Sequence, residues 1–249
     1  MLMVMDWRTV LLSVAGVSAL VGIAYLFFGN NIATRTTKPP SKGAGLRQGL
    51  NNYRVVLRNR NMLVVSMLMM MGAAGRGGGL NDLYLIPHMV RDLGLTVLMG
   101  SIAKSVQQFG GILGPLGFGW LSDRVSRKRT IQASLALSAI SSWIVAWQGP
   151  SLIPLFLSLF AYGAFTHSRM TLTMALVADS VGEEERVAAF SAFFSIGSIS
   201  APVWALATGF MMHFWGFSIA FSVLAATYII GILLMSLIEE PSRETAQDG

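Results

Sequence analysis

Seven apolar stretches, each about long enough to cross a lipid bilayer, occupy most of this 249-residue chain. A spanning helix needs about 20 predominantly apolar residues, because the hydrocarbon core of a bilayer is about 30 Å thick. The pattern predicts an all-α integral membrane protein with seven transmembrane helices. The stretches are 9–28, 62–87, 97–121, 130–147, 152–177, 187–213 and 217–238.

Composition supports the membrane interpretation and narrows the possible functions. Charged residues make up 12% of the chain, against about 25% in ordinary soluble domains. Cysteine is absent, which excludes disulfides, thiolate metal sites and a cysteine nucleophile. The three histidines are scattered over different segments. We therefore expect no cofactor, no metal site and no enzymatic activity.

Two basic loops orient the predicted helices. The loop 30–61 holds seven Lys and Arg residues, and the short loop 122–129 holds four. Because short basic loops stay on the cytoplasmic side, both are expected there, which places the N-terminus outside and the C-terminus inside a plasma membrane, or a bacterial inner membrane. Because most of the cations gather in these two loops, they suit contact with lipid better than with nucleic acid, so no nucleic-acid partner is expected.

The chain is expected to divide into four parts. Residues 1–29 form a retained helix and not a signal peptide, since Asp6 stands beside Arg8 and no clear cleavage site follows. Residues 30–61 form a cytoplasmic loop, in which apolar positions from Leu46 to Leu57 recur at helical spacing. That spacing predicts an amphipathic helix in the headgroup layer, or else a solvated helix leading into the next span. Residues 62–238 form a six-helix bundle, and 239–249 a cytoplasmic tail.

The loop that follows the third apolar stretch carries a recognisable pattern. It resembles motif A of the major facilitator superfamily, Gly-x-Leu-Ala-Asp-Arg-x-Gly-Arg-Lys followed by an apolar position, except that Ser126 replaces the second glycine. The matching residues are Gly119, Leu121, Asp123, Arg124, Arg127, Lys128 and Ile131.

The resemblance extends over nearly the whole chain as helices six to twelve of that family. It implies a helix that ends an N-terminal half, followed by the C-terminal six-helix bundle, with five helices absent. We expect a gene fragment, a mis-called start or a truncated product. The alternative is a half-transporter that dimerises or pairs with a separate N-terminal half.

The resemblance implies that the motif gates conformational change. Gly119, with Gly110, Gly111 and Gly114 upstream, is expected to let two helices approach closely. Asp123 is expected to lie within reach of Arg124, Arg127 or a neighbouring helix N-terminus, in a contact that one transporter state makes and the other breaks. The alternative is that these charges only anchor the topology. The predicted gating residues are Gly119, Asp123, Arg124, Arg127 and Lys128.

Ionisable residues at membrane depth mark candidate sites, because each costs about 3 kcal/mol or more to bury there. Lys104, Gln107 and Gln108 share one helix face with Gly111, and Tyr162, Thr166, Arg169 and Thr173 share another. His167 lies about 200° around the helix from Arg169, so we favour Arg169 as the solute contact and His167 as a packing residue.

Three consecutive glycines after Arg76 indicate a weakened helix. Transporters often place solute sites at such interruptions, and a break would let Arg76 and Asp82 converge beside Asn81. The alternative is a pair that serves only burial. The predicted solute and ion pathway comprises Arg76, Asn81, Asp82, Lys104, Gln107, Gln108, Tyr162, Thr166, His167 and Arg169.

Three cations against one carboxylate favour a small anionic solute, and Asp82 is the expected proton carrier. The predicted function is secondary active transport by alternating access, with protons, lipid and the missing half or a second subunit as partners. Multidrug or other efflux within the same family is the alternative. A non-transporting membrane fragment or scaffold is the alternative of another class.

Overall fold

The structure is a computed structural model that describes residues 7–28, 53–54, 56, 58–71 and 79–238. The described residues are helical and contain no β-strand. The chain divides into two compact units, Met1–Leu46 and Arg47–Gly249. The first contains α1, Trp7–Phe28, a helix of 22 apolar-rich residues that coincides with the first predicted stretch.

The second predicted stretch contains two helices instead of one. α3 spans Arg60–Met70 and α4 spans Gly79–Arg91. The side chain of Asn59 caps the start of α3 by accepting from the backbone amides of Asn61 and Met62. α3 ends because Met71 adopts extended backbone angles (φ −72°, ψ 111°). The expectation of one continuous helix over 62–87 is therefore wrong, and the glycines 77–79 predicted to interrupt it stand just before and at the start of α4.

The next three predicted stretches each form one helix, two or three residues longer than expected. They are α5, Val97–Arg124, α6, Arg127–Ala146, and α7, Leu152–Asp179. Side-chain oxygens of Thr96 and Ser126 cap the starts of α5 and α6. Only Val125 and the capping residue Ser126 separate α5 from α6, so the motif loop turns at these two residues.

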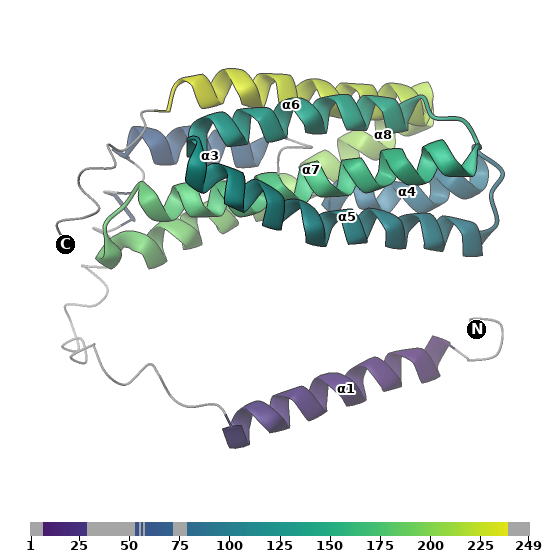
Figure 1. The fold of residues 1–249 in the computed structure, drawn as a ribbon, viewed down its shortest axis with the longest axis horizontal. Helices are drawn as coiled ribbons and strands as arrows, with labels where there is room; N and C mark the ends of the chain where they lie inside the picture. The colour runs from purple at the N-terminus through teal and green to yellow at the C-terminus, as the bar shows by residue number, and fades with distance from the viewer. Residues whose placement is uncertain (1–6, 29–52, 55, 57, 72–78, 239–249) are drawn as a thin grey trace. The chain divides into compact units, whose positions relative to one another are not determined.

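α8, Arg186–Ser236, contains the last two predicted stretches and follows a short 3-10 helix, η3, Glu183–Glu185. Its two halves are separated at Gly216, whose φ of +82° is strained for any residue with a side chain. The predicted turn at this position is therefore confirmed. Figure 1 shows the yellow C-terminal half of α8 running alongside α6.

The helices of the second unit pass back and forth, so their ends gather at two ends of one bundle. The first end holds Asn59, whose side-chain amide donates to the carbonyl of Ser180 (2.9 Å), together with the α5–α6 loop and the end of α8. The other end holds the α4–α5 turn and Gly216. The name "basic end" is used below for the first, since it carries Arg124, Arg127 and Lys128.

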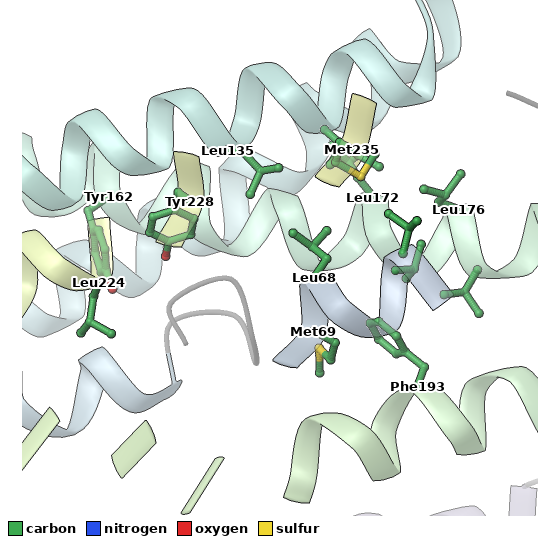
Figure 2. Close-up of a cluster of buried hydrophobic side chains, with 14 of the residues drawn as sticks. Leu68, Met69, Leu135, Tyr162, Leu172, Leu176, Phe193, Leu224, Tyr228 and Met235 are labelled. Atoms are coloured by element: carbon green, nitrogen blue, oxygen red, sulfur yellow. The ribbon is translucent and has the colours of Figure 1, made fainter. Parts of the chain in front are cut away.

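The interior of the bundle is a continuous apolar core. Leu68 and Met69 of α3, Leu135 of α6 and Phe193 of α8 are fully or almost fully buried, and Figure 2 shows them converging. Glycines admit these side chains, because a Cβ at Gly197 would overlap Met69 and one at Gly231 would press on Leu68 and Leu135.

The outside of the bundle is also apolar, which suits lipid. On α5, Phe109, Ile112 and Leu116 are each at least 64% exposed, while Ser134 and Ser138 of α6 are fully buried. Water-soluble proteins rarely expose contiguous apolar surface of this extent. Among the described residues, one helical stretch, Glu183–Ser236, meets both length and hydropathy requirements for a membrane span.

Candidate functional site

Three glycines bring the backbones of α5 and α7 into contact. A Cβ at Gly110 would overlap the backbone of Phe160, and one at Gly114 would overlap Ala164. From the other side, a Cβ at Gly163 would overlap the carbonyl of Gln107. Absent side chains are what allow membrane helices to approach this closely. The close approach expected from Gly110 and Gly114 is therefore confirmed.

This contact positions the polar face of α7 toward the interior of the bundle. Tyr162, Thr166, Arg169 and Thr173 are all at most 2% exposed. The hydroxyl of Thr166 donates to the carbonyl of Tyr162 (2.7 Å), and that of Thr173 donates to the carbonyl of Arg169 (2.8 Å). The threonine hydroxyls thus bond within their own helix. On this face, the long polar side chains of Arg169 and Tyr162 extend furthest from α7.

Arg169 is the largest fully buried side chain described, at 1% exposure. Its guanidinium carbon lies 5.8 Å from the ring centroid of Tyr228, which comes from the second half of α8. Tyr162 and Tyr228 are both completely buried, and Figure 2 shows both among the core side chains. Two residues far apart in the sequence, Arg169 of α7 and Tyr228 of the second half of α8, therefore meet in the interior of the bundle.

The polar residues of α5 form a second group. Lys104 donates to the side-chain oxygen of Gln107 (2.5 Å), and Gln107 is fully buried, whereas Gln108 is exposed. Gln107 contacts α7 at Gly163, which is six residues, or about 9 Å of helix rise, from Arg169. The Lys104 and Arg169 groups therefore occupy different levels along the bundle.

His167 faces α5 at a different point from Arg169. Its Nδ1 lies 3.0 Å from the carbonyl oxygen of Gly163, and its ring fills the space above Gly111, where an added Cβ would touch it at 2.9 Å. This is the environment of a helix-packing residue. The role of His167 in solute binding stays untested.

The remaining pathway residues cannot be placed in the same detail. Arg76 lies outside the described residues, and the side chains of Asn81 and Asp82 do also, although their backbone belongs to α4. The predicted convergence of Arg76 and Asp82 stays a prediction. Among the described residues no group of three or more His, Cys, Asp or Glu is placed to hold a metal ion.

At the basic end, the motif cations bond to other helices. Arg127 forms an ion pair with Asp179 at the end of α7 (2.9 Å). The ammonium of Lys128 donates to the carbonyls of Ser236 (2.9 Å) and Ile238 (2.6 Å), where α8 ends. Cations at a helix C-terminus satisfy its free carbonyls and its partial negative charge.

Two expectations for the motif need correction. Asp123 is exposed and forms neither an ion pair nor a hydrogen bond in the described part of the chain, because the neighbouring Arg127 extends to Asp179 instead. Arg124 stacks on Trp120, with 3.9 Å from its guanidinium carbon to the ring centroid. Gly119 has nothing within 4 Å of an added Cβ, so the close helix approach expected at this glycine is absent.

Ser126 accounts for the departure from the family pattern. Its side-chain oxygen accepts from the amide of Arg129 (3.3 Å), and its carbonyl accepts from the hydroxyl of Thr130 (2.8 Å). With φ of −165°, this position is ordinary extended backbone that does not require glycine. A serine can therefore replace the glycine and cap α6.

Sequence reasoning missed Tyr228 and Asp179 as partners of Arg169 and Arg127. Tyr228 is a polar aromatic residue in a predominantly apolar stretch, which was the available signal. No spacing rule connects it to Arg169, because the two residues belong to different helices. Asp179 likewise ends a helix far from the motif in sequence.

Comparison with known proteins gives two results. Residues 79–249 match the family model described as Major Facilitator Superfamily. A 157-residue stretch is 31% identical to an uncharacterized protein of Archaeoglobus fulgidus, an alignment that covers 60% of this chain and 69% of that protein.

Proposed function

Because this chain belongs to the Major Facilitator Superfamily, a family of integral membrane transporters, we propose that it takes part in secondary active transport of a small anionic solute. The observation that carries the proposal is Arg169, a fixed cation fully buried in the bundle. An ionisable group kept at membrane depth is a functional candidate by default. The family match supports transport, and Arg169 supports the anionic class.

The surroundings of Arg169 suit a carboxylate or phosphate. A guanidinium keeps its charge and offers paired donors that match such groups. Tyr228 supplies a phenol next to it and Tyr162 supplies a second one about two turns earlier on α7, and both phenols can donate further hydrogen bonds to an oxyanion. Lys104, one level away on α5, adds a second cation along the same helix pair. Small carboxylates and organophosphates are the proposed solutes.

Alternating access requires two bundles that rock about a shared site. The helices from α3 to α8 supply one bundle, and we assign the second to an N-terminal half or to a second subunit. The contacts of Arg127 and Lys128 at the basic end tie α6 to α7 and α8. In the proposed cycle these contacts stabilise one conformational state of the transporter. The basic end faces the cytoplasmic side of a plasma membrane or a bacterial inner membrane. Asp82 carries the coupled proton.

Thermal unfolding of the detergent-solubilised full chain tests the anionic site. Succinate and glycerol phosphate serve as probes, and binding at ten times Kd contributes about 1.4 kcal/mol of stability. We expect at least one probe to raise the Tm of the wild-type chain, and Arg169→Gln to lose that rise. Arg186→Gln, at an exposed position of α8, is the matched control and should keep it.

If a probe raised the Tm of Arg169→Gln as much as that of the wild-type chain, Arg169 would not be part of the binding site. Transport is tested separately in proteoliposomes with labelled forms of the same two probes. Uptake that depends on Arg169 supports the proposal, whereas efflux of a cationic dye without anion uptake would favour the multidrug alternative.

A further inference from the structure

His88 lies at the end of the bundle opposite the basic end and connects two helices. It belongs to the last turn of α4, one residue beyond the predicted span, and is 7% exposed. Its ring stacks on that of Phe217, with 3.5 Å between centroids and 7° between planes. Phe217 directly follows Gly216, so the stack joins α4 to the start of the second half of α8.

The two ring nitrogens of His88 have different surroundings. Nδ1 lies 2.7 Å from a carboxylate oxygen of Asp92, whose side chain is about half exposed. Since a carboxylate only accepts, the shared proton is assigned to Nδ1. Nε2 then carries a lone pair, is buried and has no hydrogen-bonding partner in the described part of the chain. Nε2 can therefore accept a proton, but the resulting N–H would need water or another acceptor to bond to.

We propose that His88 is a proton-binding site and that protonation of Nε2 releases α4 from the second half of α8. The new N–H would be a donor without an acceptor in the stacked position, and a buried donor without a partner costs free energy. Rotation of the end of α4 away from Phe217 brings Nε2 to water while Asp92 stays bonded to Nδ1. The role in a transport cycle rests on the proposed function, while the switch itself does not.

The neighbours of His88 leave Asp92 as the charge that faces it. α4 contacts α5 and α8. Gly100, in the first turn of α5, meets the side chains of Ile86, Met89 and Val90, and α8 presents Phe217, which itself stacks on Phe221. Arg91, beside His88 on α4, is exposed to solvent. Among the described residues no titratable group of α5 or α8 is brought against the imidazole.

The direction of the pH effect follows from this environment. Burial lowers the pKa of His88 below its usual value of 6.5, and the hydrogen bond and charge of Asp92 oppose that shift without reversing it. A folded pKa below the unfolded one means that the unfolded chain binds the proton more readily. The stability from neutral His88 is therefore complete above the unfolded pKa and is lost as pH falls from there toward the folded pKa.

Thermal unfolding of the full chain in detergent, from pH about 8 to about 5, tests the proton site. We expect the Tm of the wild-type chain to fall by several degrees relative to His88→Phe, which keeps the stack but cannot titrate. His213→Phe is the matched control, because His213 is exposed on α8 and its ring contacts Phe214. It should keep the wild-type profile. Parallel profiles for wild type and His88→Phe would overturn the proposal.

A thiol reporter tests the movement. The chain has no cysteine, so Ser218→Cys beside Phe217 gives a single label site. The maleimide labelling rate, divided by the rate in the His88→Phe background at the same pH, should rise severalfold as pH falls. A ratio independent of pH would overturn the release of α4.

Asp92→Asn provides a second route if His88→Phe does not fold. Removal of the carboxylate lowers the pKa of His88 further, so the midpoint of the Tm profile should move to lower pH. An unchanged midpoint would overturn the proposal. None of these measurements needs a transported solute, so loss of the switch and loss of anion transport are separate outcomes.

Discussion

Arg127, the first residue of α6, forms a 2.9 Å ion pair with Asp179, the last residue of α7. The pair joins two helices at the end of the bundle where the motif loop turns. Both side chains are partly exposed, so the pair contributes about 0.5 kcal/mol or less to the free energy of unfolding. Its importance lies in which helices it connects.

Arg127→Gln and Asp179→Asn should each lower the Tm slightly. The double variant should lower the Tm by less than the sum of the two single decreases. This non-additivity is expected because either substitution already breaks the pair. Thermal unfolding at low salt measures it, and about 0.5 M NaCl should reduce it, since salt screens exposed charges. Asp123→Asn is the control and should leave Tm unchanged. A larger loss in Asp123→Asn than in Asp179→Asn would contradict the assignment.

Ser126→Ala should destabilise the chain by about 1 kcal/mol, because it removes the oxygen that caps α6. Ser126→Gly should cost only a few tenths of a kcal/mol, since glycine is itself an acceptable capping residue. Thermal unfolding of the two variants in one detergent compares them directly. Equal Tm values for the two variants would mean that the side-chain oxygen of Ser126 contributes nothing.

The sequence patterns predicted most helices, because a long apolar stretch has few alternatives to a helix inside lipid. The turn at Gly216 and the close approach at Gly110 and Gly114 were predictable from residue type. The end of α3 at Met70 was expected only as a weakened helix, since the pattern does not tell whether neighbours hold a glycine-rich helix together.

Contacts between helices were harder to predict than the helices. Gly119 belongs to the same helix as Gly110 but lies nine residues away, about 180° around the helix axis, and nothing lies within 4 Å of its Cβ position. Tyr228 and Asp179 reach Arg169 and Arg127 from distant parts of the chain. Such pairs depend on the arrangement of the whole bundle, which periodicity along one helix does not encode.

The predicted topology can be tested in intact cells because the chain contains no cysteine. Single substitutions Arg58→Cys and Thr96→Cys, both at exposed positions, place one thiol at each end of the bundle. A membrane-impermeant maleimide should label Thr96→Cys from outside and label Arg58→Cys only after permeabilisation. The reverse pattern would place the basic loops outside and contradict the proposed orientation.

Gly163→Ala should disrupt the contact between α5 and α7. The added methyl group would overlap the carbonyl of Gln107, and overpacking of this kind costs about 1–3 kcal/mol. Gly117→Ala is the matched control on α5, since nothing lies within 4 Å of its Cβ position. That variant should be neutral or slightly stabilising, because alanine favours a helix by about 1 kcal/mol over glycine. Thermal unfolding in detergent separates the two, and a similar Tm for both would mean that the helices are not in backbone contact at Gly163.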